Sequence, residues 1–296
     1  MGQISLQMIS YINYIILKAL SLFFSVLPRF ISIFFGKCLG IFIYYLAPLR
    51  KKVAKLNIGI AFPNLSDKNI NKLLLKSYKH YGILLFEFLR QKNINIKKII
   101  FPLDSMTKEN IYKNDGQILM TAHMGNWELI VPVISKYKKM MAVAREQKNS
   151  GADKFITENR SFNNVSLISN KGSTKKMATA LLSSQLLLLV CDQNAKDKGN
   201  KVNFFGKKCS LPKGPGHFYY LTKCKLTYGF CILKEDYKYE LIIREINIKN
   251  NIEQKDDLII EINRLYTEIL EGIIKKYPEQ YFWFHKKWDK GIYKNL

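Results

Sequence analysis

The stretch that most constrains the fold of this chain is residues 117–130, QILMTAHMGNWELI, where an apolar run stops abruptly at a histidine. Residues 118–122 predict a short buried strand, which delivers His123 at its carboxyl end. Gly125 and Asn126 predict a turn, and a helix is expected to open near Trp127. In an α/β sheet, the loops at the carboxyl ends of the strands open onto the crevice where ligands bind. This stretch therefore predicts an α/β fold with a functional site at His123.

His123 and Glu128 are the first candidate pair for chemistry. A glutamate at this spacing can reach back to one imidazole nitrogen, fix the tautomer, and leave the other nitrogen free to take a proton. Gly125 permits close backbone approach, and Asn126 and Trp127 offer hydrogen-bond donors around a cavity. The alternative is a buried histidine that caps a helix, with Glu128 as an ordinary surface residue.

Short apolar runs alternate with helix-compatible segments along the rest of the chain. The further expected strands are residues 140–144, 165–169, 186–191, 226–233 and 239–243. The expected helices are residues 153–161, 174–184, 211–223 and 258–276, and residues 64–67 predict a cap before another helix with an apolar stripe. This alternation indicates an α/β fold with a central mixed, mostly parallel sheet flanked by helices.

The first fifty residues are more apolar than the rest of the chain. Residues 4–27 and 30–49 are almost wholly apolar, and the basic cluster Arg50, Lys51 and Lys52 follows them. A helix over the first segment is ~36 Å long at ~1.5 Å per residue, enough to cross a bilayer core of ~30 Å. We expect residues 1–50 to form an apolar helical membrane anchor and residues 51–296 to form a catalytic domain. A pair of helices in a soluble core is the alternative.

The charge of the chain points to a polyanionic partner. The 47 Lys and Arg residues outnumber the 23 Asp and Glu residues, which gives a net charge of +24. Nucleic acid, anionic lipid headgroups and phosphorylated substrates all fit this balance. No RNA- or zinc-binding pattern accompanies the charge, so we expect no nucleic-acid partner. The five cysteines are odd in number and lack metal-ligand spacing, so we expect them reduced and expect no metal.

Several motifs together resemble one enzyme family. HMGNWE, residues 123–128, resembles the HxxxxE/D box of the glycerolipid acyltransferase superfamily, in the HxGNWE form of the bacterial lipid A biosynthesis acyltransferases. Further matches follow the family's order: RKKVAKLNIGIAFP at 50–63, Glu87, Asp192 with Gln193, VNFFG at 202–206, and PEQYFWFH at 278–285. The chain departs from the family pattern at Lys286 and Lys287, where arginines are usual. Lysine keeps the charge but loses the bidentate fork of arginine.

The resemblance implies a fold, a reaction and a place in the cell. It implies a glycerolipid acyltransferase-like fold and transfer of a fatty acyl chain from an acyl carrier protein thioester to a hydroxyl of a lipid A precursor. The reaction is expected at the cytoplasmic face of the bacterial inner membrane, on an anionic surface, with no cofactor. The alternatives are an acyltransferase that uses acyl-CoA on another glycolipid or a lysophospholipid, and a non-catalytic membrane carrier or nucleic-acid binder.

The same resemblance suggests roles for individual residues. His123 is the expected general base and Glu128 its orienting carboxylate. Arg145, just beyond a strand, is the first candidate for stabilising the oxyanion, and Arg160 is the second. The expected substrate-binding residues are Asn126, Arg160, Asp192 and Gln193.

Two other segments attract functional interpretations. Residues 213–217, KGPGH, are glycine-rich but lack the spacing of a phosphate-binding P-loop, so we expect a turn into a helix. The aromatic and basic tail at 278–288 suits either a membrane interface or packing on the core.

Overall fold

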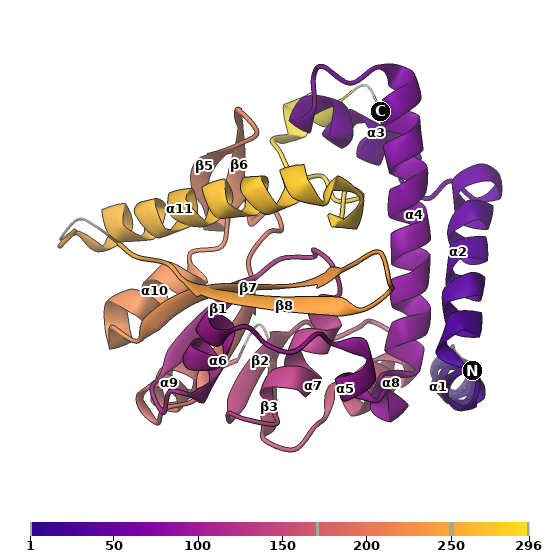
Figure 1. The fold of residues 1–296 in the computed structure, drawn as a ribbon, viewed down its shortest axis with the longest axis horizontal. Helices are drawn as coiled ribbons and strands as arrows, with labels where there is room; N and C mark the ends of the chain where they lie inside the picture. The colour runs from indigo at the N-terminus through magenta and orange to yellow at the C-terminus, as the bar shows by residue number, and fades with distance from the viewer. Residues whose placement is uncertain (1, 170–171, 249–251, 295) are drawn as a thin grey trace.

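One mostly parallel sheet organises the molecule (Figure 1). The computed structural model describes residues 2–169, 172–248, 252–294 and 296. Among these residues, six strands form the sheet in the order β3-β2-β4-β1-β7-β8, with β7 and β8 antiparallel and the other neighbours parallel. The strands are β1 (Gln117–Thr121), β2 (Met140–Ala144), β3 (Val165–Ser169), β4 (Leu186–Val190), β7 (Lys225–Leu233) and β8 (Tyr239–Glu245). The predicted α/β fold is confirmed.

The central strands are apolar because both faces of the sheet are covered. All five residues of β1 are buried, and β4 reads LLLLV. Alternating polar residues would be expected if one face met water, whereas a strand covered on both sides is apolar throughout. Leu119 pairs with Leu188, and Met120 pairs with Leu189. This register brings the carboxyl ends of β1 and β4 side by side.

Helices cover the two faces. One core layer includes side chains of α9 (Thr174–Leu182), α10 (Gly214–Thr222) and α11 (Lys255–Lys276). The other includes α5 (Ile96–Ile99), α6 (Ser105–Tyr112) and α7 (Ile130–Ile134). Side chains at the N-caps fix several helix starts, for example Asp104 for α6 and Ser173 for α9. Short 3₁₀ turns lie at η1 (Gln91–Asn93), η2 (Trp127–Leu129), η3 (Lys196–Lys198), η4 (Pro278–Gln280) and η5 (Lys290–Tyr293).

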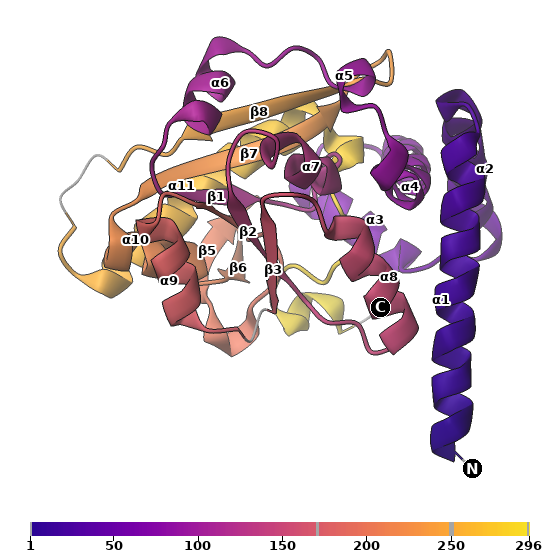
Figure 2. The same ribbon diagram turned by 90° about the horizontal axis from the view of Figure 1, so that it is seen from below.

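The N-terminal helices pack on one edge of this body. They are α1 (Gly2–Val26), α2 (Arg29–Leu46) and α3 (Lys51–Ala61), followed by α4 (Asp67–Leu89), which Ser66 caps as predicted. α1 lies beside α8 (Ser150–Arg160), and Figure 2 shows its N-terminal end projecting past the body. Two stretches, Gln7–Val26 and Arg29–Leu46, are long and apolar enough to cross a membrane by length and composition. The predicted apolar helices are confirmed, whereas the division at residue 50 stays a prediction.

Two features differ from the sequence-based expectation. A hairpin of β5 (Asn200–Phe204) and β6 (Lys207–Leu211) was not predicted, because polar residues interrupt the apolar run in both of its strands. The tail at 278–288 belongs to the core, since Trp283 and Trp288 are each 1% exposed. Their indole N–H groups donate to the carbonyl oxygens of Pro278 at 2.7 Å and Phe204 at 3.0 Å. A membrane-interface role for these two tryptophans is therefore wrong.

Candidate active site

The loop after β1 has a tight turn that only glycine fits. Gly125 has a φ of 59°, in the left-handed region that side chains with a Cβ rarely adopt. A Cβ at this position would lie 2.1 Å from the carbonyl oxygen of Cys231 in β7. The amide of Asn126 donates to that same oxygen at 2.7 Å. The turn therefore draws the chain against β7 directly after His123.

Two other parts of the chain hold the backbone of His123. Its carbonyl oxygen accepts from the amide of Phe282 at 3.0 Å and from the hydroxyl of Tyr81, on α4, at 2.9 Å. The amide of Gly125 donates to the carbonyl of Gln280 at 3.0 Å. The C-terminal segment and α4 thus clamp the histidine loop, which limits the freedom of the imidazole before any substrate binds.

The imidazole of His123 is held by a carboxylate and two rings. Its Nδ1 lies 2.8 Å from Oδ1 of Asp192, and its ring centroid lies 5.0 Å from that of Trp127 and 5.9 Å from that of Phe282. With the proton on Nδ1 donated to the carboxylate, Nε2 carries the free lone pair. Nε2 lies 3.4 Å from the side-chain amide of Gln193, and the histidine side chain remains 22% exposed. The proton-accepting nitrogen therefore faces the exposed side chain of Gln193, whereas Nδ1 faces the buried Asp192.

Electrostatics favour the ion-pair form of this dyad. Burial disfavours the charged imidazolium, but the charge and hydrogen bond of Asp192 outweigh it and raise the pKa of His123 above its ordinary value. Burial likewise disfavours the ionised carboxylate, yet the facing His123 and the charge of Lys287 together lower the pKa of Asp192. Lys287 is 3% exposed, and its ammonium donates to the backbone carbonyl of Asp192. A proton that arrives on His123 is thus stabilised by a fixed anion.

Glu128 does not play the structural part that its spacing suggested. Its two carboxylate oxygens accept from Arg160, with Oε1 2.6 Å from Nη2 and Oε2 2.9 Å from Nε. Oε1 also accepts from the indole N–H of Trp127 at 3.0 Å. Among the described residues, no hydrogen bond joins Glu128 to the imidazole, because its carboxylate turns towards α8, and its predicted role in catalysis stays a prediction. Its charge nonetheless helps to raise the pKa of His123. The carboxylate that contacts Nδ1 is that of Asp192, for which the sequence predicts substrate binding.

Comparison with known proteins decides the family. The family model described as bacterial lipid A biosynthesis acyltransferase matches residues 2–290 of the chain. The chain belongs to this family.

Two relatives agree with that assignment. The chain is similar to the lipid A biosynthesis palmitoleoyltransferase of Escherichia coli (strain K12), with 22% identity over 269 residues. It is similar to the lipid A biosynthesis acyltransferase of Shigella flexneri to the same extent. In both cases the match covers 88% of this chain and 86% of the relative. The predicted family and the predicted enzyme class, an O-acyltransferase, are confirmed.

Other residues that the sequence suggested for this acyltransferase lie around the dyad at different depths. Arg145 is exposed just beyond the end of β2, and β4 separates β2 from β1. Two strand spacings of ~4.8 Å place the ends of β1 and β2 about 10 Å apart. Within the described part of the chain, no hydrogen bond or ion pair joins the Arg145 guanidinium to His123. Asn126 is 3% exposed, so its side chain is not at a surface that a substrate reaches.

Sequence reasoning missed three residues that shape the site. Tyr81 lies on α4 and has no motif around it that indicates a function, although its hydroxyl donates to the carbonyl oxygen of His123. Phe282 flanks the imidazole from the C-terminal tail. Lys287 had been noted only as a departure from an arginine, whereas it supports Asp192. The C-terminal motif was the sequence signal for Phe282 and Lys287. Only the tertiary structure shows that this motif lies beside the histidine loop.

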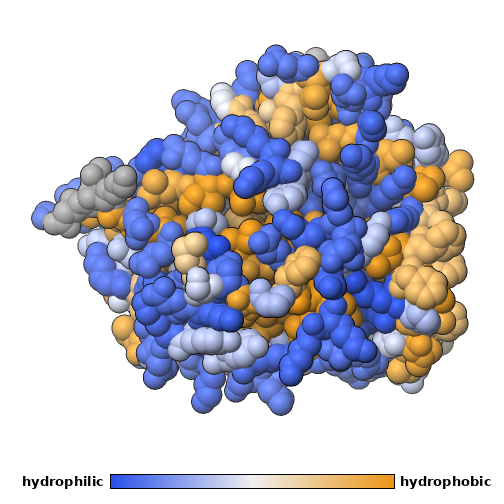
Figure 3. Space-filling view, viewed as in Figure 1, coloured by the Kyte–Doolittle hydropathy of each residue, from blue (hydrophilic) through white to orange (hydrophobic). Residues whose placement is uncertain are grey.

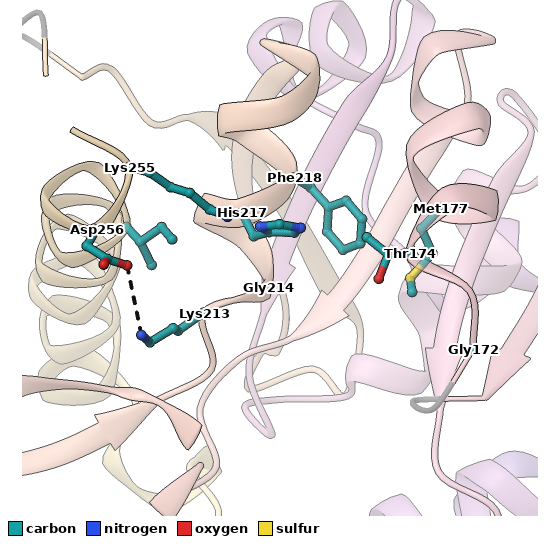
Figure 4. Close-up of a pocket in the computed structure, with 10 residues that line it drawn as sticks. Gly172, Thr174, Met177, Lys213, Gly214, His217, Phe218, Lys255 and Asp256 are labelled. Atoms are coloured by element: carbon teal, nitrogen blue, oxygen red, sulfur yellow. Dashed lines mark ion pairs between the residues drawn. The ribbon is translucent and has the colours of Figure 1, made fainter. Parts of the chain in front are cut away.

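A separate hollow lies between the starts of α9, α10 and α11 (Figure 4). It has a volume of about 420 Å³, and its lining includes Met177, His217, Phe218 and Ile259. Lys213 at its rim lies 3.9 Å from Asp256. The predicted turn before the helix is wrong, because α10 already begins at Gly214 and residues 214–217 form its first turn. Gly214 and His217 of this turn line the hollow. The dyad residues are not among those that line it.

Metal ligation has no support among the residues the structure describes. In residues 2–169, 172–248, 252–294 and 296, no group of three or more histidine, cysteine or acidic side chains is placed to hold a metal ion. Four of the cysteines are buried or partly buried and Cys38 is exposed, all as free thiols.

Proposed function

We propose that this chain transfers a fatty acyl chain from the thioester of an acyl carrier protein to a hydroxyl of a lipid A precursor, at the cytoplasmic face of the inner membrane. The observation that carries the proposal is the dyad: Nδ1 of His123 lies 2.8 Å from a buried carboxylate, and Nε2 is left to accept a proton beside the exposed side chain of Gln193. This is the arrangement that a general base for hydroxyl attack needs. Membership of the lipid A acyltransferase family supports the acceptor class.

In the proposed reaction, Nε2 of His123 removes the proton of the acceptor hydroxyl as its oxygen attacks the thioester carbonyl carbon. The imidazolium that forms is stabilised by Asp192. The tetrahedral intermediate then collapses, the carbon–sulfur bond breaks, and the thiolate takes the proton from the imidazolium. The products are an ester and a free thiol, so the histidine returns to its neutral form and no acyl-enzyme is needed.

We propose that Glu128 acts through Trp127 as a positioning residue. Glu128 is fixed by Arg160, and its Oε1 accepts from the indole N–H of Trp127. The indole in turn lies edge-on to the imidazole of His123. The pair of Glu128 and Arg160 therefore holds the indole of Trp127 in place beside the imidazole of His123. Glu128 can thus position the base without contacting the ring itself.

Donors for the oxyanion and for the acceptor are also proposals. The side-chain amide of Gln193 lies beside Nε2, where the acceptor hydroxyl has to sit, so we assign it to acceptor binding. Arg145 stays the proposed oxyanion donor, because its exposed guanidinium opens on the same edge of the sheet. Its test is Arg145→Lys, which keeps the charge but loses the planar fork and should lower kcat more than it raises KM.

Mass spectrometry of membrane lipids tests the function. We expect a deletion strain to lose one secondary acyl chain from lipid A, the parent gene to restore it, and His123→Ala to fail. His217→Ala is the matched control, because His217 lines the separate hollow. This variant should restore the secondary acyl chain of lipid A fully. Unchanged lipid A with altered phospholipids would point instead to an acyltransferase with another acceptor. Purified enzyme given acyl carrier protein or coenzyme A thioesters in parallel identifies the donor.

A further inference from the structure

The outward face of α1 is apolar from Met8 to Val26, after the exposed Gln7. Between residues 8 and 26, all the exposed residues are apolar or aromatic, namely Met8, Ile9, Tyr11, Ile12, Ile15, Ile16, Ala19, Leu20, Leu22, Phe23 and Val26. The polar residues of the same stretch are only partly exposed and lie on the other side: Ser10, Asn13, Lys18, Ser21 and Ser25. A helix surrounded by lipid is expected to be apolar all round. α1 is instead two-sided.

The polar side of α1 is fastened to the body from its first third to its end. Gly151 of α8 approaches the Ser10 carbonyl so closely that a Cβ would lie 1.7 Å from its oxygen. Lys18 forms an ion pair with Glu158 of α8 at 3.0 Å. The hydroxyl of Ser21 donates to the carbonyl of Leu89 at 2.5 Å. If α1 crossed a bilayer, these contacts would bring the charged residues of α8 into hydrocarbon, which is costly.

α2 has the same two-sided character. Its exposed residues are Phe30, Phe34, Phe35, Cys38, Ile41, Phe42, Tyr45 and Leu46. Its other face is sealed against α4 by close backbone packing: a Cβ on Gly36 would lie 2.6 Å from the Ile83 Cα, and one on Gly82 would lie 2.0 Å from the Gly36 oxygen. α2 is therefore attached to the body along its side, and its fully exposed residues are apolar or aromatic apart from Cys38, whereas Arg29 and Lys37 are only partly exposed.

The two apolar faces lie on one side of the molecule. Figure 1 shows α2 side-on and α1 end-on at the same edge, and the turned view in Figure 2 shows α1 side-on there, so the helices run crosswise. In Figure 3 this edge is largely hydrophobic. Two crosswise helices cannot both run along a membrane normal, but both can lie in its plane. Patches beyond a few hundred Å² of exposed apolar surface mark an interaction site.

We propose that the exposed faces of α1 and α2 form a platform that lies in the interface of an anionic bilayer without crossing it. This rests on the proposed membrane-bound function. Lysines border the platform: Lys154 lies 4.5 Å from the Tyr14 ring centroid, Lys37 lies 4.6 Å from that of Tyr237, and Lys51 follows α2. Cations beside an amphipathic apolar face suit anionic headgroups, with the apolar side chains entering ~5–10 Å into the boundary.

The platform also brings the dyad close to the membrane. α4 packs against α2 through Gly82, while its neighbour Tyr81 holds the backbone of His123. α2 itself and α4, each ~10 Å across, therefore lie between the outward face of the platform and the catalytic loop.

Spin-label depth measurements test the orientation. Nitroxides are placed singly at Met8, Ile15 and Val26, at the start, middle and end of the outward face, in a Cys38→Ser background. In vesicles containing phosphatidylglycerol, collision with oxygen and a water-soluble nickel complex reports their depth. We expect similar shallow depths at all three sites. A deep label at Ile15 with shallow labels at Met8 and Val26 would show a spanning helix and overturn the proposal.

Vesicle sedimentation tests the platform itself. Phe34→Glu should weaken binding at least tenfold, whereas Leu182→Glu, equally exposed but on α9, should not change it. Equal binding by the two variants would contradict a lipid-binding platform. A parent protein that forms a stable dimer in solution and does not bind vesicles would assign the face to a second copy of the chain. Acyl transfer is assayed separately on the same samples. Shallow labels with no lipid A acylation would reject the proposed function alone, and acylation with a spanning helix would reject the platform alone.

Discussion

Replacing Asp192 by asparagine removes the anion that the dyad depends on. The substitution keeps size and shape, but the imidazolium that forms during the reaction then lies buried beside a neutral amide. Removing one partner of a buried ion pair costs ~3–5 kcal/mol. At 1.36 kcal/mol for each factor of ten, Asp192→Asn should lower kcat by about 10² to 10⁴. The asparagine amide can also donate to Nδ1, which would move the ring proton to Nε2 and remove the base.

The pH profile distinguishes this effect from simple misfolding. The working base is neutral His123, so kcat/KM falls as pH drops through the histidine pKa. In the parent enzyme Asp192 raises that pKa above 6.5 despite burial. In Asp192→Asn the charge is gone and burial remains, so the acid limb should move below 6.5.

Steady-state kinetics of the detergent-purified enzyme from pH 5 to 9 provide the assay, with circular dichroism to confirm folding. Asp197→Asn is the matched control, since Asp197 is exposed in η3 and should leave rate and profile unchanged. Glu128→Gln should lower the rate but move the acid limb less than Asp192→Asn does, because Asp192 keeps both its charge and its hydrogen bond to His123. An acid limb that moves in Glu128→Gln and stays in Asp192→Asn would refute the assignment of Asp192 as the orienting carboxylate.

Three further experiments test the residues that support the site. Gly125→Ala should lower the free energy of unfolding in urea more than Gly206→Ala does. Both glycines have positive φ, but only at Gly125 would the added Cβ meet a backbone oxygen. Equal losses of stability would contradict this reasoning. Buried His80 has a pKa lowered to about 4, so the unfolding free energy of the parent should fall by about 3 kcal/mol from pH 6.5 to 4, as the unfolded chain binds a proton that the folded chain excludes. His80→Asn should flatten that dependence, and an unchanged slope in denaturant titrations would refute it. Glu128→Gln and Arg160→Gln should each cost about 1–3 kcal/mol in urea, with the double variant well below their sum, whereas strict additivity would show that the pair does not interact.

Much of the fold follows from local pattern. The strands at 140–144 and 165–169 were predicted to the residue, since short apolar runs bounded by polar turns have few other stable conformations. The β5–β6 hairpin was missed because its alternating residues carry a weaker signal. Composition could not show whether the tryptophans of the tail lie in the core or at a membrane interface, because both environments favour large aromatic residues.

The candidate site divides in the same way. The sequence by itself determined that His123 ends a buried strand and that a glycine turn follows, because both depend on neighbours in the chain. The partner of that histidine lies 69 residues away, and only the pairing of β1 with β4 brings the two strand ends together. Glu128 is closer to His123 in sequence, but the direction of the backbone after Gly125 points its carboxylate towards Arg160, with which it forms an ion pair. Sequence spacing limits which residues can meet, whereas sheet order and backbone direction decide which of them do.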